Sequence, residues 1–236
     1  MLDTIGAIFA GGLTATVVGI LVGLSQARPT VRLAAFAGAA AWLALIVTLT
    51  SLGALAPGIL GPVPPGLLPF TILIALLFAA WLLLPQFRDG LLAVPLPALV
   101  GVHVGRLGGL FFLLLYAEDR LSAPFAPVAA LGDMATAALA IPLAAMLALG
   151  FRVRATWLRM WNAVGALDLV VAVSLGLLSA PGTPFRVFSE GPGLQAMASL
   201  PWVFVPAMLV PIFLLVHLAI GAKLRLAIQP GRPALA

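Results

Sequence analysis

Cysteine is missing from this chain of 236 residues, and charged residues make up only 8% of it. The absence of cysteine excludes disulfides, thiolate metal sites, iron–sulfur clusters and a cysteine nucleophile. The scarcity of charge is equally informative, because a soluble domain carries about 25% charged residues. With 63% hydrophobic residues, the chain has more apolar surface than a soluble fold of this size can bury. The composition predicts an all-α polytopic membrane protein that forms a single domain over residues 1–236.

Several functional motifs are also lacking. No HExxH, GxSxG or Walker pattern occurs, so we predict no catalytic residues and favour a role other than an enzyme. The only lysine, Lys223, lies at the end of the last apolar segment, whereas retinal binding needs a lysine near the middle. An enzyme acting on lipid would need an acid–base pair near the headgroups. The loop carboxylates Glu118, Asp119 and Glu190 are more simply interpreted as solvated charges.

The net charge of +5 does not indicate nucleic-acid binding, because the basic residues are scattered and form no dense patch. No basic stretch precedes the first apolar run, so we expect no cleaved signal peptide. The partner that the composition predicts is the lipid bilayer.

Long apolar runs dominate what is present, and about 20 apolar residues suffice to span a bilayer. Seven such segments are predicted, at residues 5–24, 33–55, 66–84, 98–116, 127–149, 156–179 and 196–222. Short connections rich in proline, glycine and charge separate them, which makes consecutive helices antiparallel neighbours.

The distribution of basic residues predicts the orientation. With seven spans, two basic residues, Arg120 and Arg186, fall on one side. Nine fall on the other: Arg28, Arg32, Arg88, Arg152, Arg154, Arg159, Lys223, Arg225 and Arg232. Because cytoplasmic loops carry the excess of lysine and arginine, we predict an N-terminus outside and a cytoplasmic C-terminus. Aromatic residues near the segment ends are expected to form interfacial belts: Trp81, Trp157, Trp161, Tyr116 and Trp202.

Small residues and prolines predict how the helices pack. GxxxG pairs permit close approach of helices in lipid, and two are expected at contacts: Gly19 with Gly23, and Gly101 with Gly105. Prolines recur every five residues in the last segment and predict a bent helix: Pro201, Pro206 and Pro211.

Six polar residues lie inside the predicted spans, where a charge costs about 2.5–3.5 kcal/mol on insertion scales. They are the candidate ligand or ion-path residues: Arg106, Asp133, Asp168, His103, Asn162 and His217. From their depths, Arg106 can meet Asp133 or Asp168, or lie between both. One interpretation is a structural ion-pair network; the sharper one is a titratable carboxylate that binds a proton or a cationic group.

The two histidines lie at similar depth, on the fourth and seventh segments. If they face each other, they could ligate a haem iron or another metal in a redox subunit. Alternatively, each is a neutral histidine bonded to a backbone carbonyl or to Asn162. The sequence assigns no metal ligand set and no cofactor beyond that hypothesis.

Three runs, residues 106–133 (RLGGLFFLLLYAEDRLSAPFAPVAALGD), 161–176 (WNAVGALDLVVAVSLG) and 209–218 (LVPIFLLVHL), resemble a family of small bacterial multi-pass membrane proteins without a known function. The resemblance covers roughly the C-terminal half and implies a location in the bacterial inner (cytoplasmic) membrane. The function that the residues themselves favour is binding or transport of a small solute or proton through a buried charged site among the fourth to seventh segments.

Overall fold

The computed structural model describes residues 1–226, apart from residues 57, 60 and 65, and every regular element in this part is a helix. The longer α-helices are α1 (Leu2–Gly23), α2 (Pro29–Ser51), α3 (Leu67–Leu83), α7 (Phe125–Ala148), α8 (Ala155–Ser179) and α9 (Val210–Leu226). The shorter elements are α4 (Pro85–Ala93), α5 (Leu96–Gly101), α6 (Leu110–Ala117), the 3₁₀-helices η1 (Val102–Gly109) and η2 (Gln195–Ala198), and the π-helix η3 (Val205–Leu209). The predicted all-helical class is confirmed.

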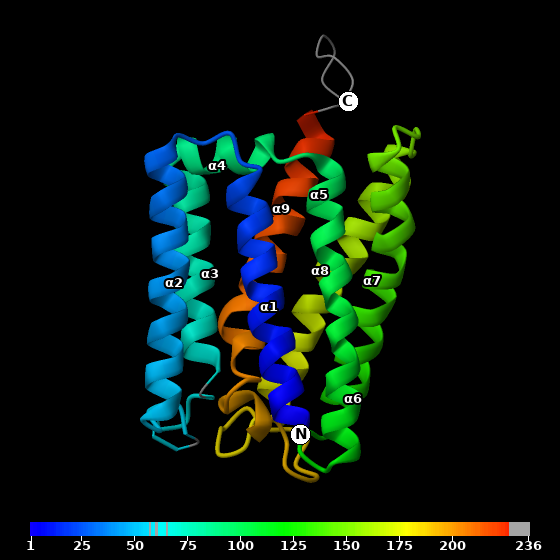
Figure 1. The fold of residues 1–236 in the computed structure, drawn as a ribbon. Helices are drawn as coiled ribbons and strands as arrows, with labels where there is room; N and C mark the ends of the chain where they lie inside the picture. Colours follow the sequence, from blue (N-terminus) through cyan, green and yellow to red (C-terminus); the bar gives the residue numbers. More distant parts are fainter. Residues whose placement is uncertain (57, 60, 65, 227–236) are drawn as a thin grey trace.

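Six helices or unbroken helical stacks in the described part are long and apolar enough to cross a membrane: α1, α2, α7, α8, Leu96–Ala117 and Val205–Leu226. The predicted segment 66–84 corresponds to α3, which has 17 residues and continues after a bend of 94° into α4. Figure 1 shows α3 running along the bundle and α4 lying across its end. A seventh candidate span exists if this bent pair is counted as one.

The fourth predicted segment, 98–116, is not a uniform α-helix. It falls within the stack α5–η1–α6, whose middle eight residues form a 3₁₀-helix. Runs of 3₁₀-helix beyond three or four residues are uncommon, and inside a longer helix they often mark a hinge or strain. Side chains three residues apart eclipse in this geometry. His103, Arg106 and Gly109 therefore share one face of η1, and all three are buried.

The two GxxxG pairs behave differently. Gly105 of η1 faces α1, where the side chain of Leu13 occupies the space that a Cβ would take. Gly101 faces α7, with a methyl carbon 3.8 Å from the position of its Cβ. Gly19 and Gly23 of α1 have no atom within 4 Å of a Cβ position, so the prediction that they mark a helix contact was wrong.

The last predicted segment, 196–222, begins too early. Residues 195–203 form η2 and further turns, and the continuous helical stack begins with η3 at Val205, after one helical residue at 204. Pro206 lies within η3 and Pro211 in the first turn of α9. Proline cannot donate the α-helical hydrogen bond, so the closely spaced prolines explain the late start and the π-helical turn. Apolar composition, which defined the predicted segment, carries no information about this boundary.

Most of the residues expected in aromatic belts are buried. Trp157 and Tyr116 are exposed, whereas Trp81, Trp161 and Trp202 are buried. The belt prediction was therefore wrong for those three tryptophans, because position near a segment end does not tell which side of the helix faces the bundle.

Polar contacts close both ends of the bundle. At the end of the bundle that α4 crosses, Lys223 Nζ donates to the carbonyl oxygens of Leu92 and Val94, each at 2.7 Å. These carbonyls end α4, so the ammonium group caps that helix and interacts favourably with its dipole. At the other end, Arg120 pairs with Asp3 at 2.9 Å. Figure 1 shows the first residues of α1 and the end of α9 at opposite ends of the bundle.

Candidate functional site

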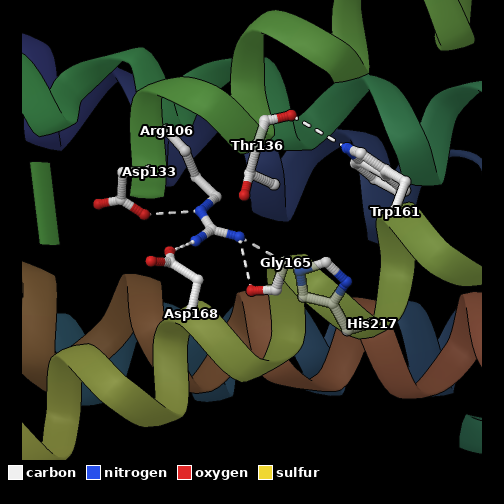
Figure 2. Close-up of polar contacts among 7 residues, drawn as sticks. All are labelled: Arg106, Asp133, Thr136, Trp161, Gly165, Asp168 and His217. Carbon is white, nitrogen blue, oxygen red and sulfur yellow. Dashed lines mark hydrogen bonds and ion pairs between the residues drawn. The ribbon is translucent and has the colours of Figure 1, made fainter. Parts of the chain in front are cut away.

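Arg106 lies in η1, is only 2% exposed, and uses its guanidinium to join three helices (Figure 2). Its Nε donates to Asp133 Oδ1 of α7 at 2.6 Å, and its Nη2 donates to Asp168 Oδ2 of α8. Its Nη1 donates to the carbonyl oxygen of Gly165 at 3.0 Å and lies 3.3 Å from His217 Nε2 of α9. Of the geometries that the sequence left open, the structure has the arginine between both carboxylates.

Arg106, Asp133 and Asp168 form a buried charged centre, and the charges of these three residues do not balance. An arginine stays protonated in proteins, so one guanidinium beside two ionised aspartates leaves a formal charge of −1. An uncompensated buried charge is costly in a low-dielectric interior. A proton or a cation bound at one carboxylate would remove the excess. The side chains of Asp133 and Asp168 are 16% and 13% exposed, whereas that of Arg106 is 0% exposed, so the carboxylates are the accessible part of the centre.

Two glycines leave room for the carboxylates. A Cβ on Gly132 of α7 would overlap the carboxylate of Asp168. A Cβ on Gly109 of η1 would lie 2.8 Å from Asp133 Cβ and 3.0 Å from a backbone oxygen of α7. Real Cβ atoms essentially never show contacts under 3.0 Å, so a side chain at Gly132 would displace the carboxylate of Asp168, and one at Gly109 would shift Asp133 or the backbone of α7.

Gly165 of α8 accepts a hydrogen bond from Arg106 and leaves room for the ring of His217. Its carbonyl oxygen accepts from Arg106, and a Cβ at this position would lie 2.8 Å from His217 Cε1. Sequence reasoning missed these glycines because the chain has 24 of them. One signal was available: Gly165 precedes Asp168 by three residues and therefore lies on the same helix face.

His217 and Asn162 form a reciprocal pair that determines the tautomer of the histidine. Asn162 Nδ2 donates to the backbone oxygen of His217 at 3.1 Å, so the amide oxygen Oδ1 is the atom 2.9 Å from His217 Nδ1. Nδ1 must then carry the proton, which leaves a lone pair on Nε2 for the N–H of Arg106. A neutral histidine bonded to Asn162, one of the sequence alternatives, fits this network.

His103 is fully buried among aromatic rings. Its ring centroid lies 4.1 Å from that of His217, and 5.3 Å from those of Trp161 and Phe213. Neither ring nitrogen has a hydrogen-bond partner among the described residues. All six polar residues predicted from the sequence thus belong to one contiguous cluster, with Arg106 at its centre and His103 at its edge.

The contact between the histidines does not suit a haem. Their rings stack at an interplanar angle of 33°, which leaves no space for a macrocycle between them. Ligation of a haem by two histidines needs one ring nitrogen on each side of the iron. Both nitrogens of His217 already face Asn162 and Arg106. Within the described ranges, no three His, Asp or Glu side chains converge as metal ligands. The geometry therefore gives the redox hypothesis no support.

Trp161 and Thr136 hold the neighbouring helices together. The indole Nε1 donates to the backbone oxygen of Thr136 across α8 and α7 at 3.0 Å (Figure 2). The same indole packs edge-on against His103. Sequence reasoning assigned Trp161 to an interfacial belt and so missed its place beside the site.

Two cavities reach Asp133. Asp133 lines a cavity of about 100 Å³ whose other walls are almost entirely apolar, between α3, α8 and the segment 194–210. A smaller cavity of about 40 Å³, on the side of α1, is lined by both Arg106 and Asp133. On the other side of the guanidinium lies His217 (Figure 2), with the ring of His103 packed against it.

The different bonding of the two histidines predicts opposite mutational effects. His103→Phe keeps the aromatic contacts and removes an unpaired buried polar group, which costs about 1–3 kcal/mol where present. We expect equal or higher thermal stability in detergent. His217→Phe loses the bonds to Asn162 and Arg106 and should lower stability by a similar amount. A melting temperature that falls equally for both variants would contradict this assignment.

The fold and the site define a helical protein that has, in residues 1–226 as described, six or seven candidate membrane spans and a buried arginine–carboxylate centre. The chain belongs to the family described as Domain of unknown function (DUF8737), whose model matches residues 63–225. The match includes all six candidate residues and excludes α1 and α2. Comparisons with curated proteins and with solved structures found no match.

Proposed function

We propose that the protein is a multi-pass protein of the bacterial cytoplasmic membrane that transports a proton or a small cationic solute through the centre formed by Arg106, Asp133 and Asp168. Seven spans follow if α3 and α4 form one crossing. The excess of basic residues on one side of that topology supports an N-terminus outside. The position of the first and last described residues at opposite ends of the bundle (Figure 1) supports an odd number of crossings.

The observation that carries the proposal is the excess negative charge of the centre. Two carboxylates flank one guanidinium, and a purely structural pair would need only one. Removing the excess requires a proton or cation, and Asp133 borders the cavity through which it would enter. The apolar walls favour a proton or a small organic cation over a strongly hydrated metal ion.

Release of the proton or solute requires a path to open on the side of Arg106 where the rings of His103 and His217 pack. The 3₁₀-helix η1 is suited to that movement. It carries both the fixed charge, Arg106, and part of the closing ring stack, His103. A change from 3₁₀ to α geometry lowers the rise from about 2.0 to about 1.5 Å per residue. Such a change would shift Arg106 relative to both carboxylates. The π-helical η3 provides a second irregular segment of the kind often found at functional sites.

Proton uptake into liposomes tests the proposal. Purified protein is reconstituted with a trapped pH-sensitive dye, and a potassium gradient with valinomycin drives uptake. We expect Asp168→Asn to reduce uptake to the level of empty liposomes while the yield of folded protein stays unchanged, because Arg106 and Asp133 remain a neutral pair. Glu190→Gln, which changes an exposed loop carboxylate, is the matched control and should retain uptake.

The competing interpretation is a network that only holds α7, α8 and η1 together. It predicts that Asp168→Asn by itself prevents folding, whereas the transport proposal predicts that this variant folds. Failure of Asp168→Asn to fold, or wild-type uptake no faster than that of empty liposomes, would refute proton transport.

A further inference from the structure

A larger cavity, of about 320 Å³, lies away from the charged centre between α1, α2, α3, α4 and α9. Its walls are almost entirely apolar, and on α2 they include the small residues Ala35, Gly38 and Ala39. Ile46 is the one residue of α2 that is buried by the described protein. The cavity therefore separates a loosely packed helix from the rest of the bundle.

One end of this cavity carries a cation. Arg32, in the first turn of α2, lines it together with Ser25. One guanidinium nitrogen of Arg32 donates to the backbone oxygen of Gly23 at 3.0 Å. Within the described part of the chain, no carboxylate lies within 4.0 Å of Arg32. The remaining N–H groups of its guanidinium can bind an anion.

Trp42 lines the cavity further along α2, and its Nε1 donates to the backbone oxygen of Ala207 in η3 at 2.8 Å. Ten residues of helix separate Arg32 from Trp42, a rise of about 15 Å. This distance equals half of the roughly 30 Å hydrocarbon core, the depth of one lipid leaflet. Arg32 near the start of α2 would then lie at the level of the headgroups.

We propose that the cavity binds an acyl chain of an anionic phospholipid, with the headgroup phosphate on Arg32. The proposal rests on the membrane location proposed above but not on proton transport. The apolar walls exclude a polar ligand, and the cation at the mouth selects an anionic headgroup over a zwitterionic one. The lipid would complete the packing of α2, whose surface the protein leaves largely uncovered.

Native mass spectrometry of the full chain can count retained lipids. The protein is purified in mild detergent with equal amounts of phosphatidylglycerol and phosphatidylcholine of the same acyl chains. We expect one phosphatidylglycerol to be retained in preference to phosphatidylcholine. Arg32→Gln should reduce that preference at least fivefold, whereas Arg28→Gln, which changes an exposed arginine at the same end of the bundle, should not.

A second pair of variants tests the cavity itself. Gly38→Leu places a side chain in the cavity, and its Cβ would meet no atom within 4 Å, so the fold should be kept. Retention of phosphatidylglycerol should be lost. Gly12→Leu, an equally open position on α1 outside the cavity, should retain it.

Each alternative outcome has a defined meaning. Equal retention of the two lipids, or retention unaffected by Arg32→Gln and Gly38→Leu, would overturn the lipid site. Proton uptake could still be observed in that case. A protein that does not fractionate with membranes would overturn the membrane location as well.

Discussion

Arg106→Gln is expected to lower the free energy of unfolding by about 3–5 kcal/mol, the cost of breaking a buried ion pair by removing one partner. The substitution leaves Asp133 and Asp168 facing each other without the cation between them, and it removes the donor to Gly165. Denaturant unfolding in detergent micelles, followed by circular dichroism, measures the loss. Arg225→Gln, at an exposed position in α9, should change stability by less than about 0.5 kcal/mol.

Neutralising all three groups together should reverse most of this loss. In the triple variant Arg106→Gln, Asp133→Asn, Asp168→Asn no buried charge remains, and neutral side chains of similar size fill the same space. Replacing a complete buried charge network is often neutral or stabilising, unlike removing a single member. The triple variant should therefore fold nearly as well as the wild type and take up no protons. A triple variant less stable than Arg106→Gln alone would contradict the charge-balance argument.

The polar residues of the site could be predicted because lipid makes each of them costly. In a chain with 8% charged residues, an arginine and two aspartates inside apolar segments need partners, and Arg106 contacts both Asp133 and Asp168. The helical class followed from the same physical constraint, since a backbone in lipid must satisfy its own hydrogen bonds.

Other features depend on local geometry that composition does not report. The 3₁₀ form of η1 places His103 and Arg106 on one eclipsed face, and neither apolar length nor hydropathy distinguishes it from an α-helix. The start of the last helix at Val205 instead of residue 196 is decided by prolines within an apolar run. Whether a glycine such as Gly132 faces a carboxylate or open space depends on helix rotation, which seven apolar segments leave undetermined.

Gly132→Ala is the second change for which we expect a large effect. The new methyl group would occupy the position of the Asp168 carboxylate, which its bond to Arg106 holds in place. Overpacking alone costs about 1–3 kcal/mol, and losing a hydrogen bond to a charged group adds about 1.5–3 kcal/mol. Gly12→Ala on α1, where a Cβ meets no atom within 4 Å, should instead be neutral or stabilise by up to about 1 kcal/mol.

A double-mutant cycle identifies the cause of that loss. Asp168→Ala removes the carboxylate that the new methyl group would overlap, while Arg106 keeps its pair with Asp133. If the overlap is responsible, Gly132→Ala should cost less than about 1 kcal/mol in the Asp168→Ala background, which corresponds to a coupling energy of at least ~1 kcal/mol between neighbouring sites. Additive effects would mean that Gly132 is needed for backbone packing of α7 against α8. The small size of Gly132 would then have no connection with the charged centre.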